Sequence, residues 1–138
     1  GEQVAFGYRH FPLAFHQDAD DASVAIECAR EQDSFELMHG ALFQQQREQS
    51  IEDLKLLAKR LEIADFAKFE KCLDEDRYRD RVNRDMATGA AAGITGTPGF
   101  IIGQHDPETG VVSGELISGA QPDKNFRALI DKYLQRGL

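Results

Sequence analysis

The sequence predicts a mixed α/β fold (α+β), in which strands and helices occupy separate parts of the chain. Apolar residues alternate with small or polar ones in the first ten positions, which is typical of a strand. From residue 18 to residue 92 the apolar spacing is instead helical. After Gly93, short apolar runs separated by turn residues predict strands again.

The first predicted element is a strand over Val4 to Arg9. Val4, Phe6 and Tyr8 alternate with small or polar residues, and Pro12 stops the pattern. Beyond this strand the chain enters the loop "HFPLAFHQD".

Five helices are predicted next from apolar residues that recur on one helical face. The third begins most clearly, because Ser50 can cap a helix in which Asp53 stands three residues on. The expected helices begin at Asp18, at Ser34 (ending near Gln46), at Ser50, near Asp65, and at Asp76 (ending near Ala92).

The segment after Gly93 predicts a β-hairpin followed by one helix. Phe100 to Gly103 and Val111 to Ser118 read as strands, separated by the polar turn "QHDPETG". Asp123 to Gln135 carries apolar residues at helical spacing and closes the chain as a helix.

Composition narrows the classes of function. A net charge of -8 disfavours unassisted binding to nucleic acid or to an anionic membrane. No apolar run approaches the ~18 residues that a membrane span needs. The first residues hold no signal peptide and no initiator Met, so we expect a fragment or a processed start.

Several phrases of the sequence, in this order, resemble the DsbA-like thiol-disulfide oxidoreductases of the thioredoxin superfamily. They are "YRHFPL", "ECAREQDSF", "MHGALF", "KCLDEDRY", "GITGTPGF" and "LISGAQP". The resemblance implies a thioredoxin-like fold with an all-helical insertion. Residues 1–17 and 93–138 would form a partial thioredoxin-like core, and residues 18–92 the helical insertion domain.

The chain departs from that family at its beginning. Family members start with a strand and a helix that carries Cys-x-x-Cys at its N-terminus, and this chain contains neither. A helix N-terminus favours the thiolate, which is the species that attacks a disulfide. We therefore expect no catalytic residue in the chain and no disulfide exchange by the chain alone.

The missing strand also affects the sheet. In a thioredoxin sheet it is central, so its loss leaves unpaired N–H and C=O groups on both sides, and each buried unpaired group costs about 1–3 kcal/mol. We expect a non-standard sheet, a strand donated by another chain in a homo-oligomer or strand-swapped dimer, or sequence outside these residues.

The resemblance gives the loop before the hairpin a role in binding. In the family the proline of this loop is cis and faces the catalytic disulfide, and the residue before it bonds the main chain of a substrate peptide. Gly96, Thr97 and Pro98 are therefore the expected substrate-binding residues. Gly99 departs from many relatives, in which we expect a side chain at this position. The lack of a side chain predicts a looser start to the strand and a wider substrate-binding groove.

Cys28 and Cys72 admit two interpretations. Free cysteines are commonly buried as small apolar residues. Alternatively, each lies on or beside the apolar face of its predicted helix, and a disulfide between them would stabilise the fold by roughly 4 kcal/mol through lost chain entropy. Such a bond would indicate an oxidising compartment.

Metal and cofactor chemistry finds little support. None of His10, His16, His39 and His105 has a partner at ligand spacing such as H-x-x-x-H. No P-loop, G-x-G-x-x-G or G-x-S-x-G motif is present. We expect neither a metal nor a cofactor.

Three functions remain open. The first is the substrate-binding and helical part of a DsbA-like enzyme that acts on extended protein thiols, in the periplasm or another extracytoplasmic compartment, with the cytoplasm not excluded. The second is a non-catalytic thioredoxin-like module that binds peptides. The third is a relative of kappa-type glutathione transferases or isomerases, which glutathione binding would separate from the others. We expect no nucleic acid or membrane as a partner.

Overall fold

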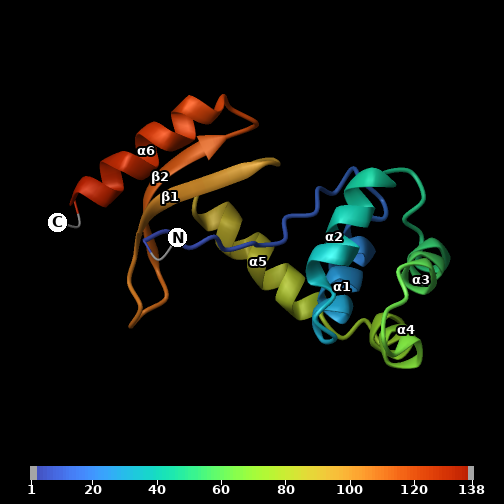
Figure 1. The fold of residues 1–138 in the computed structure, drawn as a ribbon. Coiled ribbons are helices and arrows are strands. Elements are labelled where there is room, and N and C mark those ends of the chain that lie inside the picture. The colour runs from blue at the N-terminus through green and yellow to red at the C-terminus, as the bar shows by residue number, and fades with distance from the viewer. Residues whose placement is uncertain (1–2, 137–138) are drawn as a thin grey trace. The chain divides into compact units, whose positions relative to one another are not determined.

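The computed structural model describes residues 3–136, with side chains through Gln135. It contains six helices and one two-stranded sheet (Figure 1). The elements are α1 Ala19–Arg30, α2 Phe35–Gln44, α3 Ile51–Arg60, α4 Phe66–Asp74, α5 Arg79–Ala91, β1 Gly99–His105, β2 Val112–Ser118 and α6 Asp123–Arg136. The mixed α/β class predicted from the sequence is confirmed.

The chain forms two compact units. We call Arg9–Ala87 the helical unit, and Gly1–Tyr8 with Thr88–Leu138 the sheet unit. Residues 1, 2, 137 and 138, which the predicted thioredoxin-like core includes, lie outside the described residues. None of the helices within residues 3–136 is long and apolar enough to cross a bilayer.

The helical unit is built around α1. Eight consecutive residues of α1, Ala22 to Ala29, are buried, and α1 contacts α2, α3 and α4. This burial explains the small side chains of α1, because alanine and valine allow neighbouring helices to approach closely. Other helices contribute large side chains to the same core, among them Met38, Leu42, Leu54, Leu57, Phe69, Leu73 and Val82.

Local signals fix where the helices begin. At α3 the Ser50 hydroxyl accepts from the Asp53 N–H (3.3 Å), and the Asp53 carboxylate accepts from the Ser50 N–H (3.2 Å), which confirms the predicted cap. At α4 the Asp65 carboxylate accepts from the Lys68 N–H (3.0 Å). All five predicted helices of this region are present, and α2 ends two residues earlier than predicted, at Gln44.

The sheet unit consists of a hairpin with one helix on it. β1 and β2 pair antiparallel, from Gly99 opposite Ser118 to His105 opposite Val112. The α6 helix packs on one face of the hairpin, where the rings of Phe100 and Phe126 meet edge to face at 4.9 Å. The predicted hairpin is confirmed, and β1 extends two residues past Gly103.

The strand predicted over Val4 to Arg9 is wrong. These residues have no regular secondary structure, and the sheet within residues 3–136 has only the strands β1 and β2. A strand is stable only when it pairs with a neighbouring strand, and an alternating apolar pattern does not by itself supply that neighbour. The sheet formed by the described residues is therefore non-standard, which is one of the alternatives expected from the sequence.

Candidate functional site

The loop that leads into β1 has an unusual main chain. The Thr97–Pro98 peptide bond is cis, and both residues are exposed. The Pro98 carbonyl accepts from the Gly119 N–H at 2.8 Å, which fixes this loop to the turn after β2. Pro98 is thus held at the end of the hairpin while Thr97 stands just outside the ladder.

Thr97 keeps its peptide groups open. Within residues 3–136 neither its N–H nor its C=O has a hydrogen-bond partner, and the neighbouring Gly96 is half-buried. A main-chain donor and acceptor at the start of a strand are the groups that an added peptide strand uses. The geometry therefore permits main-chain recognition at this loop.

Gly99, the first residue of β1, has a packing role. A Cβ there would lie 2.7 Å from Cδ1 of Ile94, and real Cβ atoms do not approach so closely. Ile94 therefore fills the space beside Gly99 that a side chain would need.

An open groove follows the end of β2 and the start of α6. Its volume is about 540 Å³, and it is lined by Leu116, Ile117, Ser118, Gln121, Asn125, Ala128 and Leu129. Aliphatic side chains supply most of the lining. At one end the Gln121 amide donates to the Ser118 carbonyl (3.0 Å), and the Asn125 amide donates to Gln121 Oε1 (3.3 Å).

Cys28 of α1 and Cys72 of α4 form a disulfide. Both residues are fully buried, and their Cα atoms are 5.8 Å apart. Of the two interpretations left open by the sequence, the structural disulfide is confirmed. The chain contains no other cysteine, so it holds no free thiol.

A carboxylate stands beside this disulfide. Glu31 Oε1 lies 3.8 Å from Cys72 Sγ and accepts from the Tyr78 hydroxyl (2.8 Å) and the Arg77 guanidinium (2.9 Å). Burial raises the pKa of Glu31, but the hydrogen bonds from Tyr78, Arg77 and Lys68 outweigh it and hold that pKa below its usual value. A thiolate formed at Cys72 would face this negative charge, so the geometry disfavours thiol exchange there.

A second cluster of charges is buried in the helical unit. The side chains of His10 and Glu27 are each 1% exposed, and His10 Nε2 lies 2.7 Å from Glu27 Oε1. Arg30 and Arg81 approach the same carboxylate at 3.1 and 3.0 Å. Burial raises the pKa of Glu27, but the His10 hydrogen bond and the two guanidinium charges outweigh it, so that pKa is lowered. The ionised carboxylate only accepts, so His10 Nε2 is the donor.

His10 also bonds through its main chain. Its N–H donates to Asp85 Oδ2 of α5 (3.0 Å), and Arg9 Nε lies 3.8 Å from the other oxygen of that carboxylate. The segment that enters the helical unit is therefore connected to α1 through Glu27 and to α5 through Asp85.

Comparison with known proteins assigns the chain to a family. A family model described as thioredoxin matches residues 1–132. The chain belongs to the thioredoxin family.

Relatives of this thioredoxin-like chain include segments of larger proteins. One is Na(+)/H(+) antiporter NhaA 3 of Salinispora tropica, which is 34% identical over 100 residues, or 72% of this chain and 15% of that protein. Another is Na(+)/H(+) antiporter NhaA of Nitrosospira multiformis, which is 29% identical over 102 residues, or 74% of this chain and 16% of that protein. The chain thus spans about a sixth of the length of these relatives.

The predicted site residues of the thioredoxin-like chain fall into two groups. Gly96, Thr97 and Pro98 share one loop of the sheet unit, whereas Cys28 and Cys72 are joined inside the helical unit. Within residues 3–136 no group of three or more His, Cys, Asp or Glu residues is arranged to hold a metal ion.

Sequence reasoning missed the pairing of His10 with Glu27. Sequence reasoning considered His10 only as a possible metal ligand and did not consider Glu27. A signal was present, because Glu27 lies between Ile26 and Cys28 in a helix whose apolar face it shares. A carboxylate on an apolar face needs a buried partner.

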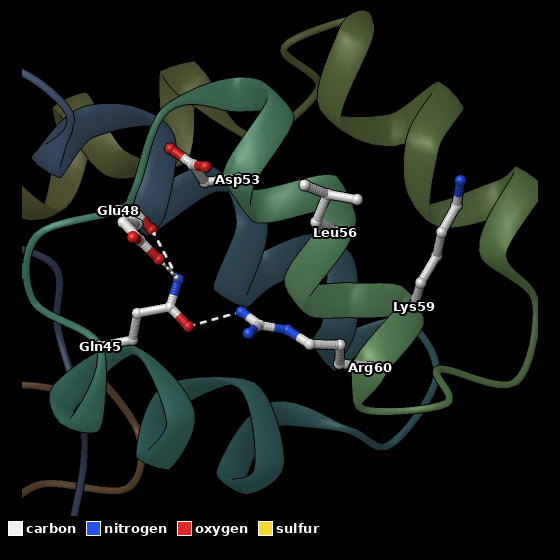
Figure 2. A pocket seen from close by; sticks show the side chains of 6 residues that line it. All are labelled: Gln45, Glu48, Asp53, Leu56, Lys59 and Arg60. Carbon is white, nitrogen blue, oxygen red and sulfur yellow. Dashed lines mark hydrogen bonds between the residues drawn. The ribbon is translucent and has the colours of Figure 1, made fainter.

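A pocket in the helical unit contains none of the predicted residues. It has a volume of about 270 Å³ and is lined by Gln45, Glu48, Asp53, Leu56, Lys59 and Arg60 (Figure 2). Gln45 bridges it, because its amide donates to Glu48 Oε2 (3.1 Å) and its carbonyl accepts from Arg60 (2.5 Å). Two carboxylates, Glu48 and Asp53, and two cations, Lys59 and Arg60, line the pocket, so it presents no net charge to a ligand.

Proposed function

We propose that this thioredoxin-like chain is the substrate-binding and helical part of a DsbA-like protein thiol-disulfide oxidoreductase. Its client is an extended polypeptide that carries thiols. In the intact enzyme the client and the enzyme form a mixed disulfide, and the Thr97–Pro98 loop holds the client chain beside it. Residues 18–92 act as a helical insertion in the thioredoxin-like core.

The observation that carries the proposal is the open main chain of Thr97. Its N–H and C=O have no partner within residues 3–136, and the bond from Gly119 to Pro98 fixes their position. The aliphatic groove at β2 and α6 belongs to the same unit and offers a surface for an apolar client side chain. Main-chain pairing with adjacent pockets supports binding of many different extended sequences.

The Cys28–Cys72 disulfide supports an extracytoplasmic location. Disulfides persist in oxidising compartments such as the periplasm and are rare in the cytosol. This bond is fully buried and lies next to Glu31, so it acts as a structural crosslink rather than as the exchanging pair.

A non-catalytic peptide-binding module is the second candidate. Both cysteines are committed to the buried disulfide, so the chain itself supplies no attacking thiolate. The similar segments in proteins named as antiporters make up 15–16% of their length, which favours a module within a larger protein.

The binding proposal is tested by titrating the isotope-labelled chain with an unfolded peptide and recording amide shifts by NMR. We expect the largest shifts at Gly96, Thr97 and Gly99. Thr97→Pro removes the main-chain donor and should weaken binding by about 3–10-fold, the value of one hydrogen bond. Thr97→Val retains that donor and should bind as the native chain does. Shifts confined to the pocket lined by Gln45 and Arg60 would refute the proposal.

The gene sequence before Gly1 separates the two candidates. A Cys-x-x-Cys motif encoded a dozen or two codons upstream would support the proposal that the chain is part of an oxidoreductase. The corresponding longer protein should then form a mixed disulfide with a peptide that contains one cysteine, and not with its serine variant. A gene without that motif would favour the non-catalytic module.

A further inference from the structure

The loop from Ile94 to Pro98 presents the open main chain of Thr97, and hydrogen bonds hold only its two ends. At the end near α5 the Ile94 N–H donates to the Gly89 carbonyl (2.9 Å). At the end near β2 the Pro98 carbonyl accepts from the Gly119 N–H (2.8 Å). Within residues 3–136 the three residues between these ends form no main-chain hydrogen bond. The position of Thr97 therefore depends on how the loop packs.

The packing of the loop centres on Ile94, which contacts the first residue of β1. Ile94 is half-buried, and a Cβ at Gly99 would lie 2.7 Å from Ile94 Cδ1 and 3.1 Å from Ile94 Cγ2. The Gly96 carbonyl oxygen would lie 3.3 Å from the same Cβ. The loop thus closes over Gly99, and Ile94 occupies the space that a side chain at residue 99 would need.

Packing, rather than main-chain conformation, is what excludes a side chain at Gly99. Gly99 is not among the described glycines with a positive φ, so its main chain suits any L-residue. Gly7, which belongs to the same sheet unit, would meet no atom within 4 Å if it carried a Cβ. The lack of a side chain at Gly99 is therefore matched specifically to the side chain of Ile94.

We propose that Ile94 is a positioning residue, whose packing on Gly99 holds the Thr97 main chain ready for a client peptide. The Ile94 contact fixes one side of Thr97, and the bond from Gly119 fixes the other. A binding segment that is ordered in advance loses less conformational entropy when its partner binds. This inference rests on the proposed peptide binding and adds to it the residue that arranges the site.

The first test measures the mobility of the Thr97 amide in the labelled chain without peptide, by heteronuclear NOE. Ile94→Ala removes both contacting atoms and should lower the NOE at Thr97. Ile94→Val removes Cδ1 alone and should give an intermediate value, which keeps the test available if Ile94→Ala unfolds the hairpin. Slow exchange of the Gly119 amide, bonded to Pro98, reports an intact hairpin in each variant. An unchanged NOE at Thr97 in both folded variants would overturn the proposal.

The second test measures the affinity of each variant for an unfolded peptide by NMR titration. Ile94→Ala and Gly99→Ala should each weaken binding about 3–10-fold, because a loop that is correctly arranged for a smaller fraction of the time binds more weakly in proportion. In the double variant the new methyl group at position 99 enters space vacated at position 94. Its affinity should therefore return to within about twofold of the native value, whereas independent losses would multiply. Gly7→Ala adds the same methyl group in open space and is the control, which should bind as the native chain does.

The two measurements separate this inference from the proposed function. If the native chain binds no peptide but Ile94→Ala still raises the mobility of Thr97, the peptide-binding proposal fails and the positioning of Thr97 by Ile94 is supported. If the native chain binds peptide and the losses of the two single variants simply multiply in the double variant, positioning through Gly99 is overturned and peptide binding stands.

Discussion

Removing the Glu27 carboxylate tests the buried cluster of the helical unit most directly. Glu27→Ala leaves His10, which is 1% exposed, without its 2.7 Å partner, and leaves Arg30 and Arg81 without their shared anion. Breaking a buried ion pair in this way costs about 3–5 kcal/mol. Single domains are stable by only about 5–15 kcal/mol, so the variant should lose a large part of its stability.

Glu27→Gln separates the charge from the hydrogen bond. The amide oxygen can still accept from His10, so the loss is limited to the attraction of two guanidinium groups whose side chains are 39% and 36% exposed. Solvent screens these pairs, so we expect a loss of about 1–3 kcal/mol, smaller than for Glu27→Ala. Urea unfolding followed by far-ultraviolet circular dichroism measures both, because α1 to α4 lie in the helical unit. Glu62→Gln is the control, because Glu62 is exposed, and it should leave the free energy of unfolding unchanged.

The sign of the pH dependence of this contribution to stability follows from the pKa of Glu27. The pKa of Glu27 is lower in the folded chain than its usual value of 4.5, so the folded state favours the ionised carboxylate. Its contribution is complete above the unfolded pKa and is lost as pH falls through the folded pKa. The difference in stability between the native chain and Glu27→Gln should therefore shrink below about pH 4.5. If Glu27→Ala lowered the free energy of unfolding by less than about 1 kcal/mol at neutral pH, the reasoning would be refuted. It would also be refuted if the difference in stability between the native chain and Glu27→Gln grew as the pH fell.

Three further results are expected. Replacing both Cys28 and Cys72 by Ala should lower the free energy of unfolding by about 4 kcal/mol. When the chain without substitutions is denatured and reduced, its mass should rise by that of two hydrogen atoms. Gly103→Ala or Gly114→Ala should disrupt the hairpin, because the new Cβ would lie 2.1 Å from a backbone oxygen of the paired strand. Faster hydrogen exchange of the β1 amides would show this disruption. The control is Gly40→Ala, since a Cβ at Gly40 meets no atom within 4 Å. The chain alone should not catalyse reduction of a protein disulfide and should not bind glutathione tightly, as turnover and calorimetry would show; tight glutathione binding would instead support the transferase relative.

The helices could be predicted because their signals are local. Ser50 and Asp53 form the expected cap, and the apolar positions that follow, Leu54, Leu57 and Ala58, are the buried ones. Both depend on residues within two turns of each other, which the sequence displays directly. The hairpin was predictable for the same reason, since its turn joins neighbouring segments.

Long-range pairing could not be predicted in the same way. The alternation of Val4, Phe6 and Tyr8 indicates a strand only if a second strand lies beside it, and the described chain provides none. The sequence could not decide between free thiols and a disulfide, because that depends on how α1 and α4 pack. Their packing brings the Cα atoms of Cys28 and Cys72, 44 residues apart, to 5.8 Å.

The two units divide stability and binding unequally. The disulfide, the Glu27 cluster and the Glu31 contacts all lie in the helical unit, so covalent and ionic links reinforce the part that already has a core. The sheet unit contains the open Thr97 main chain, and among its described residues Ile117 is the buried apolar one. Elements that bind partners are commonly among the least stable parts of a protein, because the partner supplies part of the burial. Amides of the hairpin should therefore exchange faster than those of α1, and a bound peptide should slow the hairpin amides alone.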